Sequence, residues 1–155
     1  MAESQAEQIF AKLAEVLGAM TGARPWGGSY PNAPVVEREY KAPGQITTHP
    51  HFGLLEGSGS STRILNVNPP MNIEHEFLIG IYATVIRDRE AVAQTWLQRV
   101  RDDLLATVLA NASLGGLCSG IGQSISWETD EGEFGPQAQL AMTVTYKFRD
   151  TKEVA

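Results

Sequence analysis

The sequence has little of what disulfide-bonded, membrane-spanning or nucleic-acid-binding proteins need. Its 155 residues include one cysteine, Cys118, which excludes an internal disulfide and favours a reducing compartment. No run approaches the ~18 apolar residues of a membrane span, and the N-terminus lacks the basic and apolar regions of a signal peptide. Lys and Arg total 12 against 18 Asp and Glu, a net charge of -6. This charge argues against a broad basic surface for nucleic acid. Because the sequence has no signal peptide pattern, we expect the chain to be made in the cytoplasm.

What is present is typical of one globular domain. Hydrophobic residues make up 43% of the chain and charged residues 19%, which argues against wholesale disorder. No repeat or linker divides residues 1–155. We interpret Cys118 as a half-buried apolar residue, because no recognisable motif places a His or Asp beside it.

The central element is a long strand predicted over residues 73–87. Successive side chains of a strand point to opposite faces. The odd positions, from Ile73 to Val85, are nearly all apolar, whereas the even positions begin with Glu74 and Glu76 and then become mixed. This alternation predicts one face packed on helices.

Two helices are expected to cover that face. The first begins at Ser4, where Ser4 and Glu7 have the spacing of a capping box, continues as an apolar stripe to Met20 and stops near Gly22. The second begins at or beside Asp88 and runs to about residue 111, with an apolar side and a face of alternating charge.

The last third predicts a β-hairpin: residues 121–127, an acidic turn over 128–135, and a return strand over 139–148. A short strand is also expected over residues 35–40. The predicted fold class is therefore α+β, a largely antiparallel or mixed sheet with two helices on one face and a long extended arm.

That arm is the unusual part, residues 41–72. It is rich in Pro and Gly and carries the run Gly-Ser-Gly-Ser-Ser-Thr at 57–62, so two short extended pieces around a flexible tip are predicted. Its apolar residues favour either packing on another subunit or folding back on the chain's own sheet, and both interpretations stay open. The aromatic residues of the loop at 23–34 leave a similar choice between anchoring and a partner contact. The candidate subunit or partner interface comprises Trp26, Tyr30, Phe52, Leu54, Leu55, Arg63, Ile64, Leu65 and Val67.

The sequence predicts no catalytic, cofactor-binding or metal site. His49 and His51 have a His-x-His spacing, but no Cys or carboxylate cluster accompanies them, and a metal site needs three or four convergent ligands. No nucleophile elbow, dinucleotide fingerprint or phosphate loop occurs. The hypothesis of an enzyme or ligand-binding domain requires folding to bring His49, His51 and His75 together.

The order of elements resembles a known family. The chain combines the capped helix Ala-Glu-Gln-Ile-Phe-Ala-Lys-Leu at 6–13, a Pro/Gly loop and arm, and the strand Glu-Phe-Leu-Ile-Gly-Ile-Tyr-Ala at 76–83. The helical rhythm Val-Ala-Gln-Thr-Trp-Leu at 92–97 and the closing strand Gln-Leu-Ala-Met-Thr-Val-Thr-Tyr-Lys-Phe at 139–148 follow. This arrangement is similar to the tail terminator, or tail-completion, proteins of long-tailed bacteriophages.

The resemblance implies a structural virion protein and not an enzyme. It implies a ring, a hexamer in that family, at the head-proximal end of the tail tube. Such a ring stops tube polymerisation, binds the tail tube protein and offers a docking surface to the head connector protein. DNA is expected to pass through the channel without specific binding, which an acidic wall favours. Alternatives are a tail tube, minor tail or other head-tail joining protein.

Overall fold

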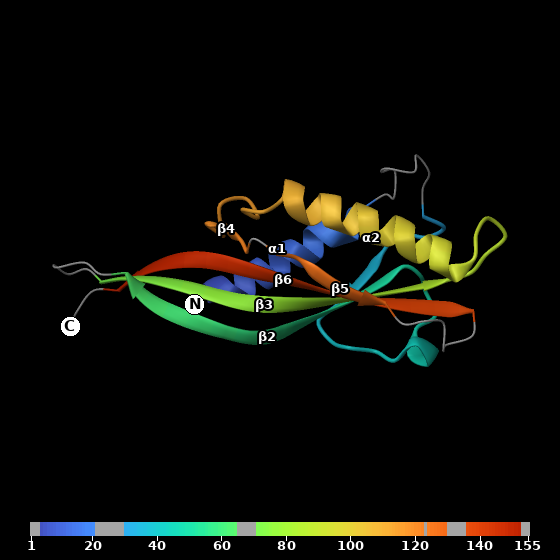
Figure 1. Ribbon diagram of the computed structural model, residues 1–155, viewed down its shortest axis with the longest axis horizontal. Helices are drawn as coiled ribbons and strands as arrows, with labels where there is room; N and C mark the ends of the chain where they lie inside the picture. Colours follow the sequence, from blue (N-terminus) through green and yellow to red (C-terminus); the bar gives the residue numbers. More distant parts are fainter. Residues whose placement is uncertain (1–3, 21–29, 65–70, 123, 130–135, 153–155) are drawn as a thin grey trace.

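The computed structural model describes residues 4–20, 30–64, 71–122, 124–129 and 136–152. It contains a six-stranded sheet with the strand order β1-β2-β3-β6-β4, and β5 pairs with β6 beside β4. β1 (Val35–Glu37) is parallel to β2 (His51–Ile64), and the remaining pairs are antiparallel. Helices α1 (Gln5–Gly18) and α2 (Ala93–Ala110) lie on one face of the sheet (Figure 1). The predicted α+β class is confirmed.

The core lies between the helices and one face of two central strands. β3 (Met71–Ile86) pairs with β6 (Gln137–Lys152) along the full length of both. The predicted alternation of β3 holds from Phe77 to Val85, because every odd position there is buried. The even positions of β6 from Ala138 to Phe148 are buried on the same face. These two apolar faces form the surface on which the helices pack.

α1 begins as the sequence predicts, because the Ser4 side chain accepts a hydrogen bond from the Glu7 backbone N–H at 3.2 Å. The Glu7 carboxylate, however, binds the Arg38 guanidinium through two hydrogen bonds of 2.7 and 3.1 Å. The helix ends at Gly18, earlier than the predicted stop near Gly22, and Gly22 itself lies outside the described residues. Ile9, Leu13 and Leu17 are fully buried, so the predicted stripe does face the core.

α2 begins five residues later than Asp88. The reason is that the Asp88 Oδ1 atom accepts hydrogen bonds from the backbone N–H groups of Glu90 and Ala91, at 2.9 and 3.0 Å. An Asp side chain that binds the backbone two and three residues ahead favours a turn over a helix. The same oxygen accepts a 2.8 Å hydrogen bond from Trp96 Nε1 and so joins the turn to the first turn of α2.

The arm predicted over residues 41–72 is largely a strand. After the short 3-10 helix η1 (Pro43–Gln45), β2 pairs with β3 from His51 to Ile64, and Gly59 to Thr62 lie opposite residues 74–77. The predicted flexible tip at 57–62 is therefore wrong. A β-bulge separates Glu56 from Gly59, and a Cβ atom on Gly59 would lie 2.7 Å from the Glu76 carbonyl oxygen. Glycine here marks a close approach of two backbones inside a bulged strand.

The two strands of the C-terminal hairpin are confirmed, with the first divided into β4 (Gly120–Ile121) and β5 (Ser126–Thr129). The acidic turn predicted from residue 128 is wrong at its start, because residues 128–129 belong to β5, and residues 130–135 lie outside the described residues. Beyond the N-terminal end of α1, β2, β3 and β6 continue as a three-stranded ribbon without helical cover (Figure 1). The protein thus has a covered part with a core and a projecting part with two broad faces.

Candidate assembly surface

The structure places several predicted interface residues in the protein's own core. Phe52 and Leu54 have exposed fractions of 0% and 1%, and Tyr30 is also buried. The Tyr30 hydroxyl donates a 2.6 Å hydrogen bond to Asp103 Oδ2 of α2. The interface prediction is wrong for Phe52 and Leu54, because side chains without solvent exposure cannot meet a partner on the folded chain. Tyr30 lines a cavity and keeps some exposed surface, so its role at an interface stays a prediction.

The other predicted interface residues have mixed outcomes. Leu55 lies opposite Gly80, on the sheet face away from the helices, and is half-buried. Arg63 and Ile64 belong to the projecting end of β2, where they pair with residues 73 and 72. Trp26, Leu65 and Val67 lie outside the described residues, so their predicted roles stay predictions.

Both long edges of the sheet have unpaired backbone. On one side, β1 covers only residues 51–53 of β2, so residues 54–64 have no strand on their outer side within the described chain. On the opposite side, β5 pairs with β6 through residues 126–129 and has no further strand beyond it among the described residues. Unpaired N–H and C=O groups of an edge strand are ready to bind another strand.

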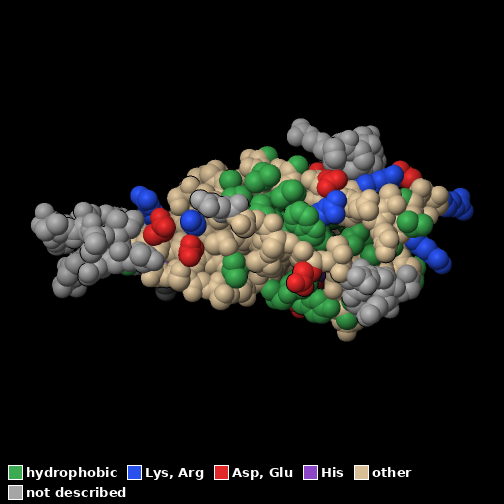
Figure 2. All heavy atoms as spheres, in the orientation of Figure 1, with side chains coloured by type: hydrophobic (Ala, Val, Ile, Leu, Met, Phe, Trp, Pro, Cys, Tyr) green, Lys and Arg blue, Asp and Glu red, His purple; other side chains and the backbone are tan. Residues whose placement is uncertain are grey.

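The β5 edge also carries an exposed aromatic side chain. Trp127 is 43% exposed although it belongs to a strand. The Arg101 guanidinium of α2 lies 5.5 Å from the centre of the Trp127 ring, and it also lies 3.3 Å from its neighbour Asp102. Hydrophobic side chains gather over α2 and the middle of the sheet on the face that carries β5 (Figure 2). The sequence predicts Trp127 only as a strand residue, and no pattern around it marks its side chain as exposed.

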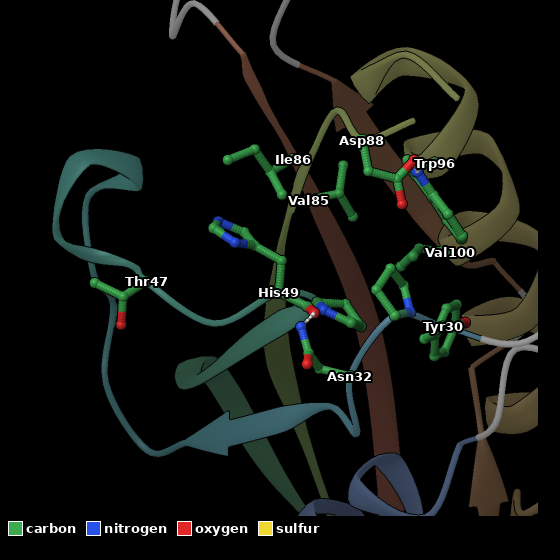
Figure 3. A pocket seen from close by; sticks show the side chains of 11 residues that line it. Tyr30, Asn32, Thr47, His49, Val85, Ile86, Asp88, Trp96 and Val100 are labelled. Atoms are coloured by element: carbon green, nitrogen blue, oxygen red, sulfur yellow. Dashed lines mark hydrogen bonds between the residues drawn. The ribbon is translucent and has the colours of Figure 1, made fainter. Parts of the chain in front are cut away.

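A cavity of about 270 Å³ lies between the first turns of α2, the end of β3 and the loops before β1 and β2 (Figure 3). Its apolar wall comes from the end of β3, the first turns of α2 and two proline-containing loops: Val85, Trp96, Val100, Pro31 and Pro50. Asn32 and Asp88 lie at its exposed rim. Three N–H groups donate to Asp88, chiefly that of Trp96, and they lower the pKa of its carboxyl, so the rim carries a negative charge at neutral pH.

The three histidines do not converge. His49 Nε2 lies 3.0 Å from Gln137 Nε2, and His51 Nε2 lies 3.6 Å from Glu37 Oε2. His75 is nine residues along β3 from Thr84, the partner of His51, a distance of about 30 Å at ~3.3 Å per residue. The histidine constellation required by the enzyme hypothesis is therefore not formed. Burial lowers the pKa of His49 and of His51, so both are neutral at pH 7. No group of three or more potential metal ligands of the His, Cys, Asp or Glu type occurs among the described residues.

Comparison with known proteins adds no assignment: no protein-family model matches the chain, and no curated protein matches it. Within the residues that the structure describes, no helix is both long and apolar enough to span a membrane.

Proposed function

We propose that this protein assembles into a ring and acts as a tail terminator: it caps the head-proximal end of a phage tail tube, stops tube growth and presents a docking surface to the head connector. The observation that carries the proposal is the pair of open sheet edges on opposite sides of the subunit, residues 54–64 of β2 and residues 126–129 of β5.

Edges on opposite sides favour a particular kind of assembly. When one side of a subunit binds the other side of the next, the interface is heterologous, and repeated contacts close into a ring if the rotation allows it. An isologous dimer would instead bury one edge against itself and leave the other open. Head-to-tail contacts therefore use both edges in every subunit, which is the simplest way to protect them.

The projecting ribbon supports the same role. It displays β2, β3 and β6 beyond the helices, where a stacked tube or connector protein can reach both of its faces (Figure 1). Its outer face carries charge pairs across β3 and β6, Glu74 with Arg149 at 3.5 Å and Glu76 with Lys147 at 3.9 Å. The side chains of these pairs are partly exposed, so the pairs contribute little to stability and can exchange partners in an assembly. The net charge of -6 suits a channel through which DNA passes without binding.

The test is the mass of the purified protein by light scattering together with electron microscopy, with and without tail tubes. Discrete rings that bind one end of preformed tubes and prevent their elongation are expected. Long tubes formed by the protein alone would identify a tube protein instead. A protein that stays monomeric at high concentration and does not bind tubes would refute the proposal.

A further inference from the structure

We propose that the contact between neighbouring copies is made by Trp127 of one copy, which inserts into the cavity beside Asp88 of the next. This inference deepens the proposed ring assembly and rests on it. It assigns an occupant to the cavity and a role to the exposed indole, neither of which the fold itself requires.

The size of the cavity selects the occupant. At about 270 Å³ it is smaller than the roughly 300–1,000 Å³ typical of sites for cofactors and drug-sized molecules. The cavity suits one large side chain. Val85 and Val100 lie on its wall, together with Trp96 of the first turn of α2. Aromatic anchors in such apolar pockets carry much of the free energy of protein interfaces.

Among the exposed large hydrophobic residues that the structure describes, Trp127 is the one that fits. Val92 lies directly before α2, near the cavity of its own subunit and away from β5. It therefore cannot reach the cavity of a neighbour that binds at the β5 edge. Tyr40 packs against Tyr82, with ring centres 5.1 Å apart. Leu109 is exposed but aliphatic, and it provides no matching charge.

Charge complementarity supports the same pairing. The positively charged Arg101 guanidinium lies over the Trp127 ring, and the negatively charged Asp88 carboxylate lies at the rim of the cavity. Arg101 already contacts Asp102, so a contact with Asp88 shares the cation between two carboxylates. Such rim pairs orient the partners more than they tighten binding.

The positions of the two surfaces complete the geometry. The cavity is bounded by residues before β1, residues before β2 and the end of β3, whereas Trp127 lies on β5 beyond β6. The anchor and its cavity therefore lie toward opposite edges of one sheet. A subunit cannot fill its own cavity this way, and each copy offers an anchor to one neighbour and a cavity to the other.

The experiment uses two variants that damage opposite sides. Trp127→Ala removes the anchor, and Asn32→Phe places a large side chain at the exposed rim of the cavity, where the Asn32 amide donates a 3.3 Å hydrogen bond to the His49 carbonyl oxygen (Figure 3). We expect each variant to raise the concentration of half-assembly by at least about tenfold in sedimentation velocity. Leu109→Ala, which deletes another exposed apolar side chain, is the matched control and should assemble as the wild type does. Circular dichroism and thermal unfolding verify that each variant is folded.

Mixing the two variants gives the decisive result. The Asn32→Phe chain keeps its Trp127, and the Trp127→Ala chain keeps an open cavity, so an equimolar mixture should form a one-to-one dimer that grows no further. Absence of that dimer, or wild-type assembly by either variant alone, would overturn the contact. If Trp127→Ala still forms rings that cap tubes, the contact is wrong and the terminator proposal stands. If wild-type chains associate through Trp127 but do not bind tubes, the terminator proposal fails and the contact stands.

Discussion

Substitution of Tyr30 by Phe removes one oxygen atom and should destabilise the protein measurably. The Tyr30 hydroxyl donates to Asp103 Oδ2 at 2.6 Å, and the two residues are only 8% and 6% exposed. They are 73 residues apart in the chain, so the bond fastens the loop before β1 to the middle of α2. Phe keeps the ring and its packing beside Trp96, whose centre lies 6.5 Å away.

The size of the effect follows from the charge of the acceptor. Hydrogen bonds to charged groups contribute about 1.5–3 kcal/mol, and a buried carboxylate that loses its donor also bears its desolvation cost. We therefore expect Tyr30→Phe to lower the free energy of unfolding by about 2–3 kcal/mol at pH 7. For a domain of this size that corresponds to a decrease in Tm of roughly 4–12 °C.

Urea unfolding followed by circular dichroism, as a function of pH, is the assay. Burial and Asp103 raise the pKa of the Tyr30 phenol in the folded state above its ordinary value of 10.0. The unfolded chain loses this proton near pH 10 and the folded chain keeps it, so the wild-type stability falls as the pH rises above about 10. Phe cannot ionise, and the difference between the two proteins should shrink in that range. A difference below about 0.5 kcal/mol at pH 7 would refute the reasoning, because surface changes produce effects of that size.

Two further predictions concern the buried side chains of Tyr146 and Cys118. The Tyr146 hydroxyl is buried without a hydrogen-bond partner among the described residues, so Tyr146→Phe should leave the free energy of unfolding unchanged or raise it by up to about 1 kcal/mol; a loss similar to that of Tyr30→Phe would contradict this. Burial raises the pKa of the Cys118 thiol from 9.0 to about 11, which leaves roughly 100-fold less thiolate at pH 8 than an unshifted thiol has. Ellman's reagent should therefore label Cys118 at least about 100-fold faster in denaturant than in the folded protein, and rapid native labelling would refute its burial.

The sequence predicts the core well because the core depends on local periodicity. The alternation from Phe77 to Val85 and the three- and four-residue steps of the helices survive in the structure as buried faces. The start of α1 was predictable for the same reason, since the Ser4 cap acts within one turn. The late start of α2 was not, because Asp88 can begin a helix or bind the turn before it, and Trp96 Nε1 favours the second arrangement here.

Local periodicity did not predict the structure of the arm at residues 41–72. Phe52 and Leu54 are two residues apart, the period of a strand with one buried face, and this was the available signal that they belong to the core. The glycines after them favoured a loop because glycine weakens a strand. Glycine is needed at position 59 because the Glu76 carbonyl oxygen lies too close for a Cβ atom. This reason depends on the strand pairing and cannot be read from the sequence. The cavity was beyond prediction altogether, since its wall joins residues 31, 50, 85 and 96–100, which no local pattern connects.

The bulge in β2 bears on how a neighbour can bind. It shifts the register between Glu56 and Gly59, so the open edge is not one continuous ladder but two segments, residues 54–56 and 59–64. A flat strand from a second copy can pair with either segment and cannot continue across the shift. β5 contains four residues, Ser126–Thr129, and when Trp127 enters the cavity near Val85 this strand lies beside residues 54–56, which pair with residues 79–81 of β3, and not beside residues 59–64. The bulge therefore limits each edge contact to a few residues, which blocks indefinite sheet growth between copies and leaves side-chain anchors such as Trp127 to determine which copies associate.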